Sequence, residues 1–322
     1  MADPTGIDSR FQSLATRVVV ALVAIPIILW AVFAGGYPFF VFVALISSFS
    51  LYEFYGIAEK KGAAPLKTVG IIFGLFVNFS FVYERSQVDL YQFFETLGVR
   101  LSMFSQLQFL LVLQLKFVLF VLLVELFRKK GSPMMNVGAT VLGVLIVSLF
   151  FGTLIALREL FPYGFPTYKF FSTGLANADH LATINRWGGY TVASLFVSIW
   201  LCDTAAYFGG VSFGKHKLFE RVSPKKTWEG AIFGFVFAVA TMVAAQQFLI
   251  EYLRLVDAIV LGVIVGVFGQ AGDLVESRFK RDAGMKDSSA IIPGHGGVYD
   301  RFDSLVFVAP IAYLYLDFVV LS

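Results

Sequence analysis

The sequence has little charge, only three histidines, and a single cysteine in 322 residues. One cysteine, Cys202, excludes an intrachain disulfide and gives no basis for a thiolate metal site. Charged residues make up 15% of the chain and hydrophobic residues 58%, which excludes an ordinary soluble globular domain. Lys and Arg form short clusters and no long basic run, so no nucleic-acid partner is expected. The composition predicts an integral membrane protein.

Apolar segments recur along the whole chain. A helix needs about 20 mainly apolar residues to cross ~30 Å of hydrocarbon. The run after Arg17 resembles a signal peptide, but no small-residue cleavage site clearly follows and further spans come later, so we interpret it as a retained helix. The fold class is therefore an all-α polytopic bundle of about nine transmembrane helices. They are expected near 18–34, 39–58, 69–83, 106–127, 137–157, 190–210, 230–250, 258–277 and 304–321.

The positive charges between these spans predict the topology. With a cytoplasmic N-terminus, the inner segments hold 18 Lys and Arg residues and the outer segments hold 6. We therefore expect a multi-pass protein of the inner (cytoplasmic) membrane. Residues 1–189 would form five N-terminal spans with extracytoplasmic loops, and residues 190–322 four C-terminal spans with cytoplasmic loops.

Two features of the sixth and seventh predicted spans carry charge. Asp203 lies inside the sixth span, where it is either an acceptor for a bond between helices or a ligand for substrate or metal. Ahead of the seventh span, Ser223-Pro-Lys-Lys-Thr-Trp-Glu-Gly230 predicts a helix start with Ser223 as the N-cap. Such a start directs free N–H groups toward the cytoplasm, and Lys225 and Lys226 add positive charge. The block therefore indicates an anion site.

The eighth predicted span ends in a pair of acids. Asp273 and Glu276 are three residues apart and share one helix face. Two interpretations are open: ligation of a metal ion, or ion pairs with Arg278 or Lys280.

The segment from Ser277 to Asp303 is the most polar part of the C-terminal half. Asp300 and Asp303 are three residues apart, and Asp303 or Ser304 could instead be the N-cap of the last span. The turn Pro293-Gly-His-Gly-Gly allows backbone N–H groups to approach a ligand, with His295 as a phosphate contact. Four basic residues complete a pocket suited to a polyphosphate: Lys280, Arg281, Lys286 and Arg301. The acids suit Mg²⁺, so the combination is typical of phosphoryl or nucleotidyl transfer.

Five blocks between residues 199 and 304 together resemble the phosphatidate cytidylyltransferases, also called CDP-diacylglycerol synthases. The longest is the run from Ser277 through Phe-Lys-Arg, Lys-Asp, Ile-Pro-Gly-His-Gly-Gly and Asp-Arg-x-Asp303. The others are Asp203-Thr-Ala-Ala-Tyr-Phe-Gly-Gly, Phe213-Gly-Lys-His-Lys-Leu, Ser223-Pro-Lys-Lys-Thr-Trp-Glu-Gly and Gly272-Asp-Leu-x-Glu-Ser. The N-terminal half is similar only as a set of hydrophobic spans.

The resemblance implies a membrane enzyme that makes CDP-diacylglycerol and pyrophosphate from CTP and phosphatidic acid, with Mg²⁺ and room for a monovalent cation such as K⁺. It implies Asp273 and Asp300 as metal ligands, with Glu276 and Asp303 as further candidates. Asp273, Asp300, Lys226 and Arg301 are the expected catalytic residues. The bilayer is an expected partner and a homodimer is allowed. A CTP-dependent lipid kinase and a secondary transporter are the alternative functions.

Overall fold

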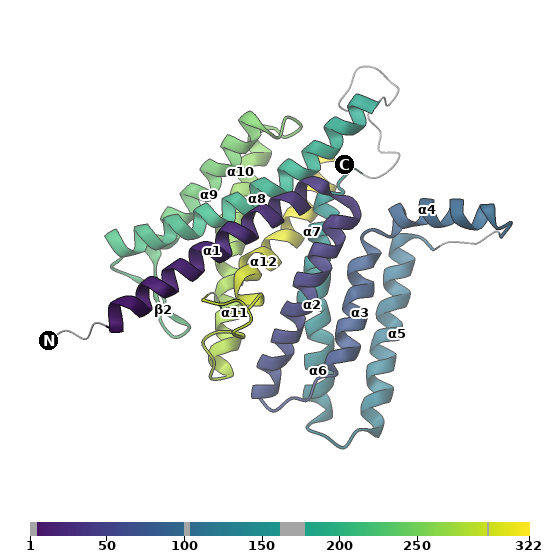
Figure 1. The fold of residues 1–322 in the computed structure, drawn as a ribbon, viewed down its shortest axis with the longest axis horizontal. Coiled ribbons are helices and arrows are strands. Elements are labelled where there is room, and N and C mark those ends of the chain that lie inside the picture. Colours follow the sequence, from purple (N-terminus) through teal and green to yellow (C-terminus); the bar gives the residue numbers. More distant parts are fainter. Residues whose placement is uncertain (1–4, 100–103, 162–177, 295) are drawn as a thin grey trace.

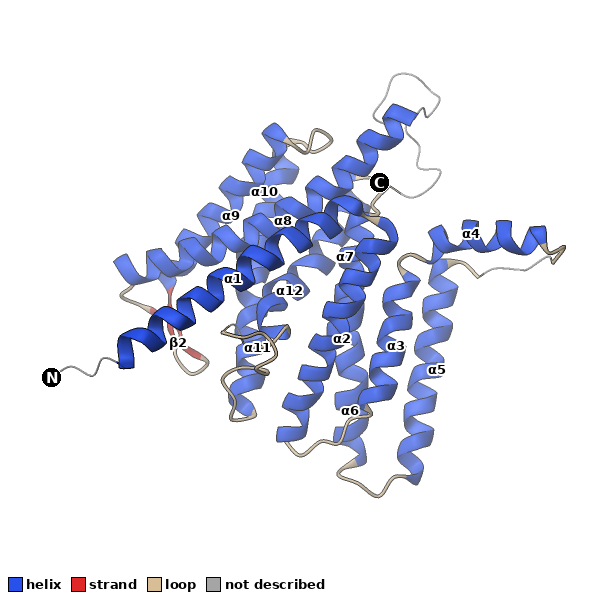
Figure 2. Ribbon diagram, viewed as in Figure 1, coloured by secondary structure: helices blue, strands red, loops and turns tan. Residues whose placement is uncertain are grey.

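The protein is a bundle of long helices with one small hairpin (Figure 1). A computed structural model describes residues 5–99, 104–161, 178–294 and 296–322. Figure 2 shows that helix dominates the described residues and that the only strands among them are a single antiparallel pair. The all-α fold class predicted from the sequence is confirmed.

The described part of the N-terminal half contains eight helical segments. They are α1 (Thr5–Ala34), α2 (Gly36–Lys60), α3 (Lys67–Ser80), α4 (Tyr83–Thr96), α5 (Gln106–Phe127), α6 (Pro133–Gly143), the π-helical turn η1 (Val144–Leu149) and α7 (Phe150–Arg158). Segments α6, η1 and α7 form one continuous span of 26 residues.

The C-terminal half contains the hairpin and the remaining helices. They are α8 (Ala178–Phe213), β1 (Lys217–Phe219), β2 (Ser223–Thr227), α9 (Trp228–Phe248), α10 (Leu255–Ile264), η3 (Val265–Gly269), α11 (Gln270–Asp282), α12 (Tyr299–Tyr315) and η4 (Leu316–Val320). Segments α10, η3 and α11 form one span of 28 residues, and α12 with η4 forms another of 22 residues.

Among the described residues, the number of helices able to cross a membrane differs from the nine predicted. Seven helices of the described chain are long and apolar enough to cross a membrane, and the count is eight if the bent pair α3 and α4 is one span. Helix α3 has only 14 residues before the chain bends by 81° into α4, and the apolar part of α1 is the short stretch Val18–Ala34. The other seven predicted spans each coincide with a long helix.

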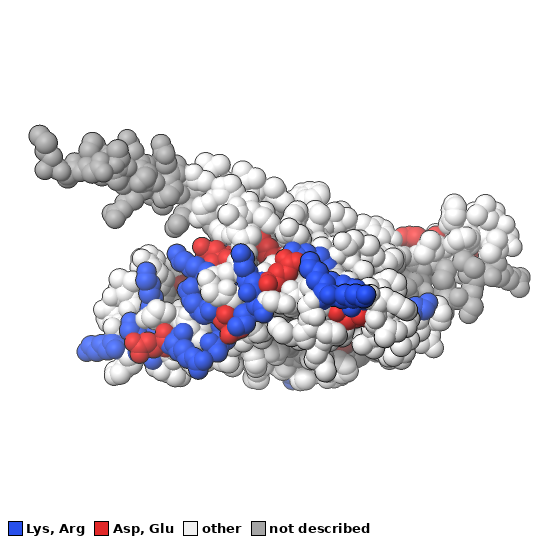
Figure 3. All heavy atoms as spheres, turned by 90° about the horizontal axis from the view of Figure 1, so that it is seen from below, with Lys and Arg blue, Asp and Glu red and all other residues white. Residues whose placement is uncertain are grey.

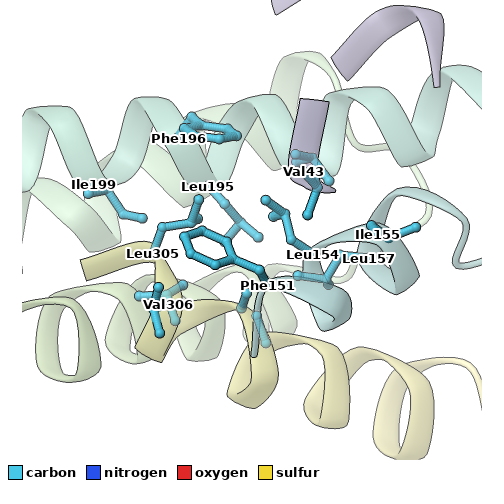
Figure 4. Packing of buried hydrophobic residues seen from close by; sticks show 14 of the residues in the cluster. Val43, Phe151, Leu154, Ile155, Leu157, Leu195, Phe196, Ile199, Leu305 and Val306 are labelled. Atoms are coloured by element: carbon cyan, nitrogen blue, oxygen red, sulfur yellow. The ribbon is translucent and has the colours of Figure 1, made fainter. Parts of the chain in front are cut away.

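The core lies where α2, α7, α8 and α12 meet. Val43, Phe151, Leu195 and Leu305 come from these four helices and are fully or almost fully buried (Figure 4). Because lipid tails are as apolar as these side chains, tight packing rather than escape from water favours this association. The core holds the start of α12 beside helices from the N-terminal half.

Charged side chains gather at one end of the bundle. Figure 3 shows Lys, Arg, Asp and Glu residues mixed over the face seen from below in Figure 1. The α2–α3 and α5–α6 connections, the hairpin and the end of α11 all lie toward this end (Figure 1). These four basic segments, which we predicted to be cytoplasmic, are thus on the same side of the bundle.

Two predicted helix starts are wrong. Ser223 is not an N-cap, because it belongs to β2 and pairs with Phe219 of β1. Helix α9 begins at Trp228, five residues after Ser223, and Thr227 caps it by accepting the N–H of Gly230 at 3.2 Å. Asp303 does not cap the last helix either, because α12 begins at Tyr299 and places Asp303 inside its second turn.

Candidate active site

The hairpin delivers a lysine to the acidic end of α11. The Lys226 ammonium donates to Asp273 Oδ2 at 2.5 Å, and Ser277 Oγ donates to Asp273 Oδ1 at 3.2 Å. Side chains alternate along a strand, so Lys225 on the other face of β2 is exposed. The structure therefore brings together the block that begins at Ser223 and the block that begins at Gly272, through Lys226 and Asp273, which are 47 residues apart.

Two further acids lie near Asp273. Asp203 of α8 is exposed and interacts electrostatically with Asp273, Lys226 and Arg301. Asp303 of α12 interacts electrostatically with both Asp203 and Asp273. Because ionisable groups at membrane depth normally face the bundle interior or a water-filled cavity, this grouping supports a site over an interhelical hydrogen bond for Asp203.

Lys280 lies between two carboxylates. Its ammonium is 2.5 Å from Glu276 Oε2 on the same helix and 2.6 Å from Asp300 Oδ1 on α12. All three residues are buried, with Lys280 only 8% exposed. The predicted ion pair of Glu276 with Lys280 is present. The same ammonium also binds Asp300, so one positive charge links an acid of α11 with an acid of α12.

Asp300 also holds the loop that precedes α12. Its carboxylate accepts the N–H of Ser288 at 3.0 Å and the N–H of Gly297 at 2.8 Å. Gly296 has a φ of 82°, and a Cβ there would lie 2.7 Å from Asp300 Oδ2, so this turn requires glycine. Asp300 is therefore fixed by its own loop as well as by Lys280.

A pocket of about 650 Å³ opens beside this loop. Lys286, Gly294, Gly296 and Arg301 are among its lining residues. It combines two cations with glycine backbone, which suits a polyphosphate. His295, expected to contact phosphate, lies outside the described residues.

Two other predicted phosphate-binding residues, Arg281 and Ser223, lie in or against the β1–β2 hairpin. Arg281 Nε donates to the Val222 carbonyl at 3.5 Å and Arg281 Nη1 to the Met285 carbonyl at 3.2 Å. Ser223 is half-buried in β2. Arg281 thus ties α11 to the hairpin and does not line the pocket.

The acids fit Mg²⁺ in donor type. Within the described ranges, no three His, Cys, Asp or Glu side chains converge closely enough to hold a metal ion by themselves. Mg²⁺ is commonly bound by one or two carboxylates with phosphate oxygens and water completing the shell, so the residues present remain compatible with it. Asp273 can accept the ion if Lys226 moves away, and Asp300 if Lys280 does.

The sequence interpretation missed Glu53. This residue of α2 is 2% exposed, and its carboxylate accepts bonds from the loop before α12. The available indication was a lone acid in the second apolar span, since such acids inside membranes are commonly functional. No pattern in the sequence connects it with a loop more than 230 residues away.

The comparisons with known proteins cover most of the chain. A model of the cytidylyltransferase family matches residues 15–319. A phosphatidate cytidylyltransferase of Bacillus subtilis is 32% identical over 303 residues, which are 93% of this chain and 96% of that protein. One of Synechocystis sp. is 29% identical over 93% of this chain and 95% of that protein. One of Staphylococcus epidermidis is 45% identical over 116 residues, 36% of this chain and 45% of that protein. The chain belongs to the cytidylyltransferase family.

Proposed function

We propose that the protein is a phosphatidate cytidylyltransferase, which transfers CMP from CTP to phosphatidic acid and releases pyrophosphate. One observation carries the proposal beyond the family relationship. The Lys226–Asp273 pair joins the hairpin to α11, whose far end lies toward the charged end of the bundle, and a pocket lined by Arg301 opens in the loop that follows α11. A nucleotide from water and a lipid headgroup can meet at such a place.

The reaction needs positioning and charge neutralisation. An oxygen of the phosphatidic acid phosphate forms a bond to the α-phosphorus of CTP, and the bond from that phosphorus to the bridging oxygen breaks. The electron pair leaves with pyrophosphate. A phosphate oxygen is already ionised near pH 7, so no general base is required.

The basic residues are proposed to hold the phosphates. Arg301 and Lys286 line the pocket and would contact the β- and γ-phosphates of CTP. Lys226 is the cation nearest to Asp273 and would exchange that carboxylate for a phosphate oxygen when substrate binds. Ser223, Lys225, Lys280, Arg281 and His295 are proposed to support the same phosphates.

Asp273 and Asp300 are proposed to hold Mg²⁺, with Glu276 and Asp303 as nearby acids and K⁺ as a second cation. Bound Mg²⁺ would supply positive charge to the phosphate oxygens of the transition state. Asp203 would orient Lys226 and Arg301, with which it interacts electrostatically.

The lipid substrate would approach along α8 and α9. An apolar pocket of about 270 Å³ lies between these helices and is lined by Thr204, Phe208, Phe233 and Phe237, among others. Thr204 follows Asp203 in the chain, so an acyl chain in this pocket would place its headgroup near the acids. We further propose an inner-membrane location with the N-terminus in the cytoplasm, from the charge distribution.

A reconstitution experiment tests the proposed function. The purified protein in mixed micelles with CTP, phosphatidic acid and Mg²⁺ is expected to form CDP-diacylglycerol and pyrophosphate in equal amounts. Omitting phosphatidic acid or adding a chelator should abolish both products. Protein that binds CTP but forms neither product would contradict the proposal.

A further inference from the structure

Glu53 connects the N-terminal helices with the loop beside the candidate active site. Its Oε1 accepts Ser289 Oγ at 2.6 Å and the Val298 N–H at 3.0 Å. Its Oε2 accepts Ser288 Oγ at 2.8 Å and the Tyr299 N–H at 2.8 Å. Each oxygen of this one buried carboxylate therefore accepts two hydrogen bonds, one from a serine hydroxyl and one from a backbone N–H.

These bonds cap α12 from a different helix. The N-cap position is Val298, whose side chain cannot accept a hydrogen bond. The first N–H groups of a helix have no partner within the helix, and the positive end of the helix dipole favours a negative charge nearby. Glu53 supplies both the acceptor and the charge for Val298 and Tyr299.

The loop is held between Glu53 and Asp300. Ser288 contacts both acids, because its hydroxyl donates to Glu53 and its N–H donates to Asp300. Gly297 fills the space between them: a Cβ there would lie 2.0 Å from Ser288 Oγ and 2.5 Å from Glu53 Oε2. A side chain at position 297 would therefore collide with the groups that join the loop to Glu53.

We propose that Glu53 is a positioning residue for the reaction, and the proposal rests on the function proposed above. By holding residues 288–289 and the first turn of α12, Glu53 sets the places of Asp300 and Arg301. Asp300 follows Tyr299 directly, and Arg301 lines the pocket. The role of Glu53 is exerted through these residues, because its own oxygens are occupied by the loop.

A matched residue distinguishes this role from a purely structural one. Glu125 of α5 is also buried, with 5% exposure, and also accepts from two partners: Asn136 at 2.6 Å and Arg128 at 2.8 Å. Arg128 directly follows α5 and Asn136 lies in the first turn of α6, and neither is a candidate site residue. Loss of either acid should affect stability, whereas only loss of Glu53 should loosen the loop.

The test compares Glu53→Gln with Glu125→Gln. Glutamine keeps the size of the side chain but has one oxygen and no charge, so one backbone N–H and one hydroxyl lose their acceptor and the start of α12 loses its negative charge. In E53Q, amide hydrogen exchange at Val298 and Tyr299 should be about tenfold faster than in the wild type. At saturating substrates kcat should fall about 10²-fold, because small displacements of positioned groups have effects of that size. E125Q should change neither quantity, whatever its melting temperature.

The outcomes separate this inference from the proposed function. Unchanged exchange at Val298 and Tyr299 in folded E53Q would overturn the inference, and so would equal losses of kcat in E53Q and E125Q. If E53Q does not fold, Ser289→Ala removes one donor and should show the same two changes at smaller size. Wild-type exchange and turnover in that variant would also overturn the inference. Absence of CDP-diacylglycerol formation by the wild type would instead contradict the proposed function, and the exchange measurement would still test the loop.

Discussion

The Lys226 ammonium donates to the Asp273 carboxylate at 2.5 Å, and this bond joins β2 to α11. The pair is partly accessible, with about 30% of each side chain exposed. It neutralises a carboxylate that would otherwise stand near Asp203 and Asp303. Binding of a phosphate and a cation would separate the pair, since each then gains a partner of opposite charge.

Removing the Asp273 charge should abolish most activity. Asp273→Asn and Asp300→Asn are each expected to reduce the rate by about 10³-fold or more, if both carboxylates hold the Mg²⁺ that would supply positive charge to the phosphates. The double variant should be little worse than either single one, because groups that act as a unit are not additive. Asp282→Asn is the control, because Asp282 is 50% exposed and pairs with Lys61 at the surface. Near-normal turnover by folded D273N would remove Asp273 from the site.

Lys226 should matter more than its neighbour on the hairpin. Lys226→Met is expected to lower kcat/KM by about 10²-fold, the usual effect of losing one preorganised donor to developing charge. Lys217→Met changes an exposed lysine of β1 and should have a small effect. Steady-state rates with CTP varied would measure both. Equal, small losses in the two variants would contradict a phosphate-binding role for Lys226.

The start of α9 can be tested by stability. Thr227→Ala should lower the free energy of unfolding by about 1 kcal/mol, because it removes the side-chain cap on Gly230. Ser223→Ala should lower it much less, since Ser223 lies in β2 and caps nothing. Unfolding of both variants in a series of denaturing detergent mixtures gives the comparison. A larger loss for S223A would support the helix start expected from the sequence.

The topology predicts which residues react from each side of the membrane. In a Cys202→Ser background, cysteines at Lys129 and His216 should be labelled from the cytoplasmic side, and a cysteine at Glu95 from the opposite side. Glu95 is exposed near the end of α4, beyond the bend after α3. Impermeant thiol reagents on intact cells and on inverted vesicles provide the measurement. Labelling of all three from one side would contradict the arrangement.

The sequence was sufficient for the fold class and for most spans. Hydropathy is a local property, so each long apolar run became a helix. Local rules failed at two helix starts, where pairing or capping by another segment decided the structure. Ser223-Pro looked like a helix start, but pairing with Phe219 made it a strand. Asp303 looked like a cap, but Glu53, 246 residues before Tyr299, does the capping.

The candidate site was partly predictable for the same reason. Spacing placed Asp273 with Glu276 and Asp300 with Asp303, because residues three apart share a helix face. It could not predict that Lys226 would pair with Asp273, or that Lys280 would bind Asp300 across 20 residues. Those pairs depend on how α11 packs against the hairpin and α12.

The most direct test of the proposed function follows two labels of CTP. A cytidylyltransferase moves the α-phosphate with its cytidine, whereas a kinase moves only the γ-phosphate. With phosphatidic acid and Mg²⁺, label from the α-position should appear in the lipid and label from the γ-position in pyrophosphate. If γ-label appears in the lipid while α-label remains in CDP, the protein is not a phosphatidate cytidylyltransferase.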